Sequence, residues 1–254
     1  MLDLPRLTDV DVSNKKVIVR GDLDISEINE NDLRLKSLIP TLKYLLEKKA
    51  EVVLMGHRGR PEGKVDNEFS LKPIETLLKK MLARDDFEVL ENLRFDSREE
   101  SNDDGYAKEL ASLGDIYVNE AFSVCHREHT SIVGIPKYLP HFSGLNLTNE
   151  IENLNKVFDP ERPLVILISG VKKDKLEMIK PLSNLADKVL VGGRLPDFLG
   201  DNTVSVRNQN GKVIIGNLVM DKEDITLNTV EKFKEEIMKA KTIVLAGVLG
   251  KYED

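Results

Sequence analysis

The sequence GDIYVNEAFSVCHREHTS, residues Gly114–Ser131, joins a short apolar run to a loop with several cationic side chains. The apolar run, Ile116–Val118, is typical of a strand. It is followed by His126, Arg127 and His129. These three could be ordinary polar loop residues, but ligands of open α/β sheets bind where the strands end. The stretch therefore predicts a ligand site at the end of a strand.

The same arrangement recurs elsewhere in the first half of the chain. The strand-like runs KVIVR (Lys16–Arg20) and EVVLM (Glu51–Met55) each lead directly into an irregular loop. A third run, Phe87–Leu90, leads into ENLRFD. The charged or imidazole side chains of these loops include Asp22, Asp24, His57, Arg58, Arg60 and Arg94. Repetition strengthens the prediction, because one arginine after a strand is a weak signal.

Between these runs, apolar residues recur at helical spacing. Leu33–Lys49 predicts a long helix, and Arg34 in its first turn is either solvated or part of an anion site. Leu71–Leu82 predicts a second helix with Ser70 as its N-cap, and Tyr106–Leu113 predicts a third. Strands that alternate with helices of this length indicate a mainly parallel sheet with helices on both faces.

Right-handed crossovers place the loops that follow parallel strands at one edge of the sheet. We therefore expect one crevice to collect the side chains of His57, Arg60, Arg94, His126 and Arg127. Guanidinium groups beside imidazole donors suit a small ligand that has both a phosphate and a carboxylate. Asp22 and Asp24 would bind hydroxyl groups of this ligand or orient the arginines.

The composition is that of an ordinary globular protein. Of its 254 residues, 41% are hydrophobic and 32% are charged, which argues against long disorder. The length allows one large domain or two small ones. Proteins that bind nucleic acids or anionic membranes usually carry an excess of Lys and Arg over Asp and Glu. The formal net charge of -7 therefore disfavours such a partner. Cys125 is the single cysteine, and the first residues lack a signal-peptide pattern, so we expect a cytoplasmic protein.

The loops and their flanking elements together resemble the phosphoglycerate kinase family. The similar motifs are, in the family's order, VIVRGDLDIS, LIPTLKYLLEKKAEVVLMGHRGRP, SLKPIETLL, VLENLRF, AKELASLGDIYVNEAF and HREHTSIVGIPKYLP. They cover essentially all of residues 14–141, and as a set they are very specific. The resemblance implies an α/β fold with two domains, each a mainly parallel sheet flanked by helices, of which the second is abbreviated.

By this resemblance the first domain binds 3-phosphoglycerate. The implied substrate-binding residues are Asp22, Asp24, Arg34, His57, Arg60, Arg94, His126 and Arg127. Arg34 is also implied in catalysis, where it would stabilise the phosphoryl group during transfer. Asp24 stands where the family usually has asparagine, and Arg58 where it usually has leucine. The first change adds negative charge beside an anionic ligand, and the second adds positive charge that could compensate.

The second half resembles the family through weaker motifs. Asn146–Phe158 resembles the helix that joins the family's two domains. LVILISG, Leu164–Gly170, predicts a buried strand, and the lysines after it either bind phosphate or are solvated. The resemblance implies contacts to the nucleotide phosphates from Lys172 and Lys175, with a catalytic role for Lys175. The turn that carries them looks one residue shorter than in the family.

The resemblance further implies a nucleotide-binding glycine turn at Gly192 and a ribose-contacting loop with Glu253. Arg194 stands in a position that is normally small and uncharged. The family's glycine-rich loop and magnesium-binding aspartate have no counterpart before Asp254, and residues between Gly200 and Asn228 look abbreviated, so we expect a shortened member. Its cofactor would be ATP/ADP with Mg²⁺, and no residue is assigned as a metal ligand.

The expected organisation is a phosphoglycerate-binding domain over residues 1–145, a connecting helix over 146–158 and a truncated nucleotide-binding-like domain over 159–254. Three functions stay open. The first is a phosphoglycerate kinase-like enzyme that transfers phosphate between ATP and 3-phosphoglycerate. The second is a catalytically impaired paralogue that binds 3-phosphoglycerate or a similar phosphorylated acid, and the third is a regulatory partner that binds neither ligand. The oligomeric state, and whether a partner chain completes the nucleotide site, are open as well.

Overall fold

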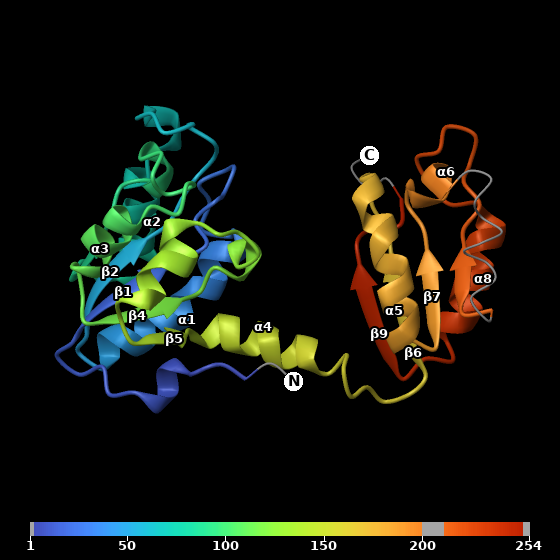
Figure 1. Cartoon of the computed structure of the whole chain (residues 1–254), viewed down its shortest axis with the longest axis horizontal. Coiled ribbons are helices and arrows are strands. Elements are labelled where there is room, and N and C mark those ends of the chain that lie inside the picture. The colour runs from blue at the N-terminus through green and yellow to red at the C-terminus, as the bar shows by residue number, and fades with distance from the viewer. Residues whose placement is uncertain (1–2, 200–210, 251–254) are drawn as a thin grey trace. The chain divides into compact units, whose positions relative to one another are not determined.

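The structure is a computed structural model that describes residues 3–199 and 211–250. The chain divides into two compact units, and the border lies between Glu152 and Asn153. Each unit is built around its own sheet, and every strand pair in both sheets is parallel (Figure 1). This confirms the expected fold class. No helix in the described ranges is long and apolar enough to span a bilayer.

The first unit has a five-stranded sheet in the order β3-β2-β1-β4-β5. Its strands are β1 (Lys16–Arg20), β2 (Glu51–Met55), β3 (Phe87–Val89), β4 (Ile116–Asn119) and β5 (His141–Ser143). Its α-helices are α1 (Leu33–Glu47), α2 (Lys72–Leu82), α3 (Asp104–Ala111) and α4 (Leu145–Asn155), and the unit border falls inside α4. Short 3-10 or π turns are η1 (Leu7–Asp9), η2 (Asn67–Phe69), η3 (Leu93–Phe95), η4 (Phe122–Val124), η5 (Thr130–Gly134) and η6 (Ile135–Lys137).

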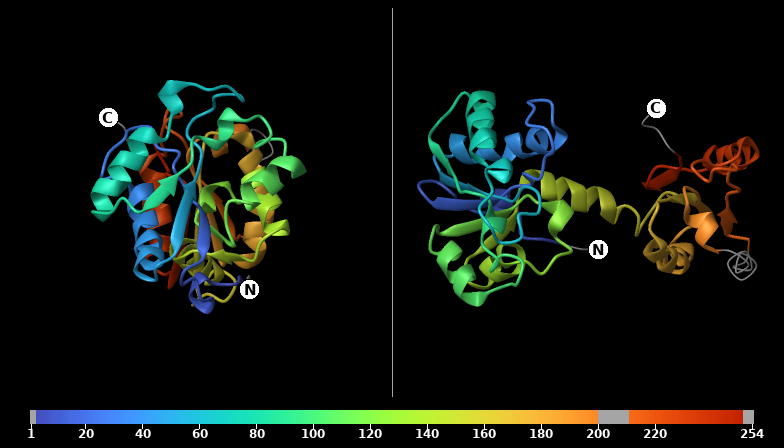
Figure 2. Two further views of the ribbon diagram at one scale, coloured as in Figure 1. Left: turned by 90° about the vertical axis from the view of Figure 1, so that its left-hand side faces the viewer. Right: turned by 90° about the horizontal axis from the view of Figure 1, so that it is seen from above.

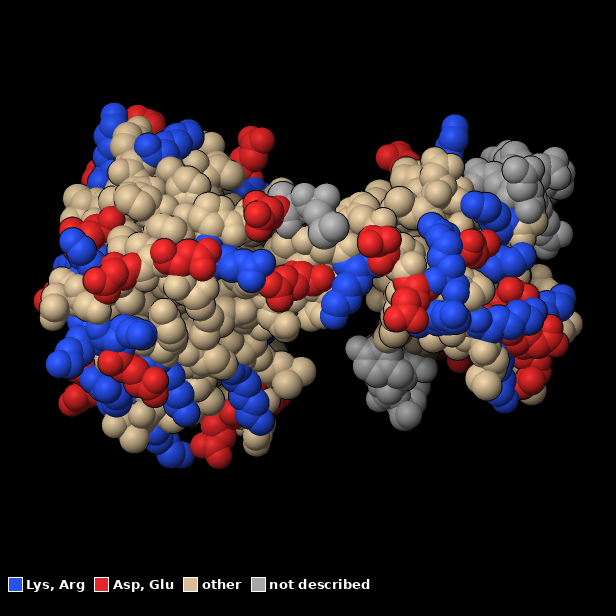
Figure 3. Space-filling model, turned by 90° about the horizontal axis from the view of Figure 1, so that it is seen from below, with Lys and Arg blue, Asp and Glu red and all other residues tan. Residues whose placement is uncertain are grey.

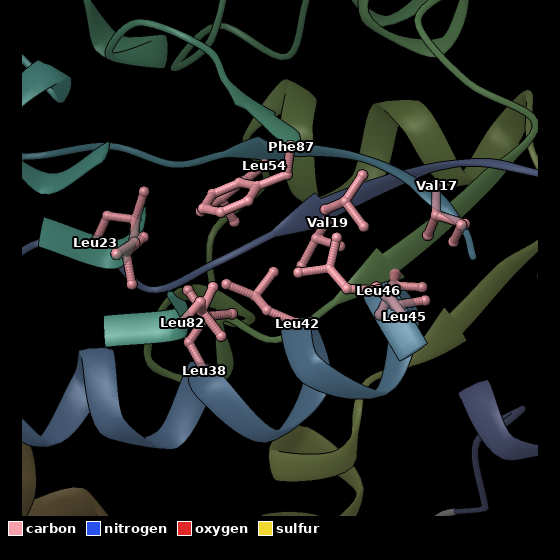
Figure 4. Packing of buried hydrophobic residues seen from close by; sticks show 14 of the residues in the cluster. Val17, Val19, Leu23, Leu38, Leu42, Leu45, Leu46, Leu54, Leu82 and Phe87 are labelled. Carbon is pink, nitrogen blue, oxygen red and sulfur yellow. The ribbon is translucent and has the colours of Figure 1, made fainter. Parts of the chain in front are cut away.

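Helices cover both faces of this sheet (Figure 2, left). Successive residues of a strand point to opposite faces. Val17 and Val19 of β1 therefore pack on the side of α1 and α2, whereas Ile18 packs on the side of α3. Figure 4 shows the first side, where the partners of these valines include Leu38, Leu42, Leu45, Leu54 and Phe87. Burial on both faces explains why the central strands are continuous apolar runs.

The second unit has a four-stranded sheet in the order β8-β7-β6-β9. Its strands are β6 (Leu164–Ile168), β7 (Lys188–Val191), β8 (Val213–Ile215) and β9 (Thr242–Ala246). Its helical segments are η7 (Lys173–Met178), α5 (Ile179–Leu185), α6 (Leu195–Leu199) and α8 (Leu227–Ile237). Ile166 of β6 packs with Ile179 of α5, and Leu167 packs on the opposite face with Phe233 of α8.

The strands KVIVR and EVVLM have the predicted bounds, and the predicted helices differ from the observed ones by a few residues at their ends. The N-cap position of α2 is one residue later than predicted, although Ser70 Oγ accepts the N–H of Lys72 (3.3 Å), the first residue of the helix. The cap residue is Leu71, whose N–H donates to Glu91 Oε1 (2.7 Å), while Ser70 donates its hydroxyl to Glu91 Oε2 (2.8 Å). Helix α3 begins at Asp104, two residues before the prediction, because the Asp103 carboxylate accepts the N–H of Tyr106 (2.7 Å).

The start of α4 is held by the carboxylate of Glu120, which is 4% exposed. Glu120 accepts the N–H groups of Asn146 (3.1 Å) and Leu147 (2.8 Å), and the hydroxyl of Thr41 donates to the same carboxylate. Burial raises the pKa of Glu120, although these donors favour its ionised form. A side chain at the end of β4 thus fixes the first turn of the helix that crosses the unit border.

We expect Glu120→Ala to lower the free energy of unfolding by about 1–3 kcal/mol, because buried N–H groups lose their acceptor. Urea unfolding followed by circular dichroism measures this loss. Glu152→Ala, in the same helix, is a matched control, since it removes only an exposed ion pair with Arg6 (2.8 Å) that contributes up to about 1 kcal/mol. Equal losses in the two variants would contradict the capping role of Glu120.

Candidate functional site

The first unit gathers charged side chains at the carboxyl edge of its sheet. The parallel register places Arg20, the last residue of β1, beside Met55 of β2 and Asn119 of β4. The loops that follow these strands therefore begin side by side. They carry most of the side chains that the sequence assigns to a ligand site. On the face of the molecule shown in Figure 3, cationic and anionic side chains are interspersed.

Arg20 of β1, His57 and Asp24 form a chain of contacts, in which Arg20 and His57 are buried and the side chain of Asp24 is 42% exposed. Arg20 is fully buried, and one terminal nitrogen of its guanidinium lies 2.9 Å from His57 Nδ1. His57 is 2% exposed, and its Nε2 lies 3.6 Å from Asp24 Oδ2. The other oxygen of Asp24 accepts the backbone N–H of Gly59 at 2.8 Å. The neighbouring imidazole of His57 holds the pKa of Asp24 well below its usual range, and burial lowers the pKa of His57.

Two arginines beside this chain have buried nitrogens without a hydrogen-bond acceptor. Arg94 is 3% exposed and donates from one terminal nitrogen to the carbonyl of Gly59 (2.7 Å). Its Nε lies 3.1 Å from Glu100, yet neither this Nε nor the second terminal nitrogen makes a hydrogen bond within the described chain. The buried Nε of Arg127 is likewise unsatisfied there. Burial lowers the pKa of Arg94, and the charge of Arg127 acts in the same direction.

Uncompensated buried donors are costly, since each forfeits about 1–3 kcal/mol until an acceptor arrives. Two guanidinium groups that repel each other add to that cost. An anion with several acceptor oxygens would satisfy both groups at once, and phosphate is such an anion. The arrangement is therefore suited to binding a small phosphorylated ligand.

Asp22 and Arg34 lie together at the same edge. Arg34 Nε lies 3.5 Å from Asp22 Oδ2, and Arg34 also donates to the backbone carbonyl of Asp24. The hydroxyl of Ser123, in the loop after β4, donates to Asp22 Oδ2 at 2.8 Å. These contacts link the loops that follow β1 and β4 to the first turn of α1.

Arg60 and His126 are exposed and have no hydrogen-bond or ion-pair partner in residues 3–199 and 211–250. Arg58, by contrast, donates to three backbone carbonyls, those of Ile25 (3.0 Å), Ser26 (3.2 Å) and Glu68 (2.5 Å). Its guanidinium thus joins neighbouring loops, and Arg60 is the arginine of this loop with free donors.

Sequence reasoning missed the residues that support these side chains. Arg20, Glu99 and Ser131 form a buried network: Arg20 Nε donates to Ser131 Oγ (3.0 Å), and Ser131 Oγ donates to Glu99 Oε1 (2.6 Å). His129 is buried and lies 3.9 Å from Glu99, beside the site instead of in it. The signal for Arg20 is its place after three buried strand residues and before a glycine. Glu99 has no such signal, because it lies in a polar run.

The second unit has a cavity of about 420 Å³ at the carboxyl ends of β6, β7 and β9. Lys175 lines it and donates to the carbonyl of Ser169 at 2.7 Å. Gly193 lines it with a φ of 57°, where a Cβ would come within 2.6 Å of Ser169 Oγ. Arg194 and Glu223 also line this cavity.

Two residues assigned to the nucleotide, Gly192 and Lys172, are outside the lining of this cavity. A Cβ at Gly192 would come within 2.5 Å of Leu249 Cδ2, so this glycine allows Leu249 to pack closely against the backbone. Lys172 is exposed, precedes η7 and is outside the lining as well. Glu253 lies outside the described residues. The neighbouring Gly193 fits the prediction of a glycine turn at the cavity better than Gly192.

The described residues do not fit a magnesium ion held by the protein. No group of three or more His, Cys, Asp or Glu side chains within them is placed to hold a metal ion. In the cavity of the second unit, Glu223 is the carboxylate among the lining residues, whereas Lys175 and Arg194 are cationic. Such a lining suits phosphate groups, and carboxylate oxygens are what magnesium requires from a protein.

Comparison with known proteins agrees with this geometry. A family model described as "Phosphoglycerate kinase" matches residues 7–88 and 81–212. The phosphoglycerate kinase of Pseudothermotoga lettingae is 37% identical over 276 residues, which cover 97% of this chain and 68% of that protein. The phosphoglycerate kinase of Moorella thermoacetica is 40% identical over 215 residues, and this match covers 74% of the chain but only 54% of its relative. The chain thus matches about half the length of that relative.

Solved structures give the same result for the fold. The structure of phosphoglycerate kinase from Coxiella burnetii superposes with a TM-score of 0.85 at 26% identity, over 99% of this chain and 82% of that one. The phosphoglycerate kinase of Pyrococcus horikoshii has a TM-score of 0.79 at 24% identity, which shows the shared fold. Because the family model covers most of the chain, and a relative of 37% identity is matched over two thirds of its length, the protein belongs to the phosphoglycerate kinase family.

Proposed function

We propose that this protein binds 3-phosphoglycerate in its first unit and transfers phosphate between this acid and ATP. The observation that carries the proposal is the pair Arg94 and Arg127, whose buried guanidinium nitrogens lack an acceptor in the described chain. A phosphorylated ligand supplies that acceptor. Membership of the phosphoglycerate kinase family supports this choice among phosphorylated acids.

The proposal assigns a role to each group at the carboxyl edge of the first sheet. Arg94, Arg127 and the free guanidinium of Arg60 would neutralise the phosphate, because planar donor forks match its oxygens. His57 and His126 would donate to the carboxylate or hydroxyl of the ligand. Asp22 and Asp24 would accept hydroxyl protons or orient the arginines. Arg34, with a side chain that is 46% exposed, would reach the phosphoryl group in transfer.

For the donor side, the proposal uses the cavity of the second unit. Lys175 and Arg194 line it and would contact the phosphates of a nucleotide, while the glycines Gly193 and Gly247 leave room for the approach of the ligand. Lys172 and Glu253 stay candidates for the same nucleotide. The proposal thus places phosphoglycerate binding in residues 1–145 and nucleotide binding in residues 159–254, joined by the helix at 146–158. Phosphoryl transfer depends mainly on such positioning and charge neutralisation.

A second candidate is a binding protein without turnover. It is favoured by the ammonium group of Lys175, which donates to the carbonyl of Ser169 (2.7 Å) and lies 3.5 Å from that of Ala246. In this position the lysine satisfies the ends of β6 and β9 and leaves less of its donor capacity for a nucleotide. Loss of one preorganised donor costs about 100- to 1,000-fold in rate in comparable sites.

Calorimetry and a coupled assay separate these functions. We expect 3-phosphoglycerate and ATP with Mg²⁺ each to bind, and we expect turnover that Lys175→Ala abolishes. If 3-phosphoglycerate binds but no turnover is detected at high protein concentration, the protein is a binding protein and not an enzyme. Absence of binding by both compounds would contradict the proposal and favour a regulatory partner.

Arg60→Ala tests the phosphate contacts without disturbing the fold, because Arg60 is exposed and has no partner in the described chain. We expect the affinity for 3-phosphoglycerate to fall about 10- to 150-fold, since a hydrogen bond to a charged group contributes about 1.5–3 kcal/mol. The control is Arg84→Ala. Arg84 is exposed and forms an ion pair with Asp86, and both residues precede β3 at its amino end, away from the candidate site at the carboxyl end. Equal affinities of the Arg60 variant and wild type, measured by calorimetry, would remove Arg60 from the site.

Asp24→Asn tests the negative charge inside the site. The pKa of Asp24 is held below its usual range, chiefly by the neighbouring imidazole of His57, so Asp24 stays ionised at every pH above about 4. It then repels an anionic ligand, whereas the amide oxygen of asparagine can still accept a hydrogen bond from a ligand hydroxyl. Asp24→Asn should therefore tighten 3-phosphoglycerate binding about fivefold, for about 1 kcal/mol of repulsion. The ratio of the two affinities should be constant from about pH 5 to pH 8, because Asp24 does not titrate there. Weaker binding by the Asn variant would instead show that the carboxylate contacts the ligand favourably.

A further inference from the structure

Arg20 is the one arginine among the fully buried large side chains of the described residues. Each of its three guanidinium nitrogens has a partner. Nε donates to Ser131 Oγ (3.0 Å), and one terminal nitrogen donates to the carbonyl of Gly21 (2.5 Å). The other terminal nitrogen lies 2.9 Å from His57 Nδ1. The carboxylate of Glu99 accepts the hydroxyl and N–H of Ser131 (2.6 and 2.9 Å), so the position of Ser131 is fixed as well. The guanidinium therefore has one orientation.

The contact between Arg20 and His57 has only one possible polarity. A guanidinium group carries donors and no acceptor. His57 Nδ1, at 2.9 Å from it, must therefore accept, which requires Nδ1 to be free of a proton. The proton of the neutral imidazole is then on Nε2, the nitrogen that lies 3.6 Å from Asp24 Oδ2. A proton on Nδ1 would put two donors face to face in a buried place.

The charges around His57 act together with this contact. Arg20 from β1 and Arg94 from η3 oppose a positive imidazole, whereas Asp24 from the loop after β1 favours it. Burial outweighs the effect of Asp24, so the pKa of His57 lies below its ordinary value. His57 is thus neutral at pH values where an exposed histidine is partly charged.

We propose that Arg20 is a positioning residue that holds His57 as the neutral tautomer with its proton on Nε2. In this tautomer Nε2 carries the donor, which faces Asp24 and the space beside it. The tautomer follows from the contacts of the free protein alone. That the Nε2 donor serves a ligand carboxylate or hydroxyl rests on the proposed function.

Nitrogen NMR of the free wild-type protein tests the tautomer directly. The protein is labelled with ¹⁵N-histidine, and the signals of His57 are identified by their loss in His57→Gln. We expect Nδ1 to have the shift of an unprotonated nitrogen and Nε2 that of a protonated one at neutral pH, with any titration of His57 displaced below that of an ordinary histidine, because burial lowers its pKa. A proton on Nδ1, or a titration of His57 near pH 6.5, would overturn the proposal.

A variant then tests whether Arg20 is the cause. Arg20→Met keeps an unbranched side chain of similar length without donors, and we expect its His57 to populate both tautomers, because no donor then requires Nδ1 to accept. Arg84→Met is the matched control and should leave the His57 signals as in wild type. Unchanged His57 signals in a folded Arg20→Met protein would overturn the assignment to Arg20. Because no ligand is present, these outcomes are independent of whether 3-phosphoglycerate binds.

Discussion

The hydrogen bonds of the buried Arg20 guanidinium are the contacts on which the candidate site in the first unit depends. They join the end of β1 to the loop after β2, through His57, and to the turn after β4, through Ser131. An unpaired guanidinium could not remain at 0% exposure, because its desolvation would cost several kcal/mol. The parallel register of β1, β2 and β4 brings these loops within reach, and Arg20 then fixes how their side chains point.

The resulting site has buried positive charge that lacks acceptors among the described residues. Arg94 and Arg127 present buried donors without acceptors, and Glu100 is the carboxylate nearest to Arg94. Asp24 supplies negative charge, but its oxygens are directed to Gly59 and His57. The free energy stored in these unmet donors is available to an incoming anion, whose binding would replace repulsion between guanidinium groups by charge-assisted hydrogen bonds. The second unit is similar in outline, with Lys175 and Arg194 around a cavity at its strand ends.

The sequence predicts the strands of the first sheet well where both faces are buried, because KVIVR and EVVLM each contain an uninterrupted apolar run, Val17–Val19 and Val52–Met55. It misses β5 and β8, two three-residue edge strands whose few residues give no periodicity. For the site, spacing after strands is enough to find His57, Arg94 and Arg127. It is not enough to find Arg20 or Glu99, since their burial depends on contacts across 32 to 111 positions of sequence. The same limit applies to the glycine turn at residues 192 and 193, because which of two adjacent glycines faces a cavity is set by φ and by packing against Leu249.

The most direct test of the account is a crystal structure of the protein with 3-phosphoglycerate. The account predicts that phosphate oxygens accept hydrogen bonds from the two nitrogens of Arg94 that now lack an acceptor and from Arg127, with His57 Nε2 toward the rest of the ligand. A ligand bound elsewhere, with these guanidinium groups still unsatisfied at saturating concentration, would contradict it.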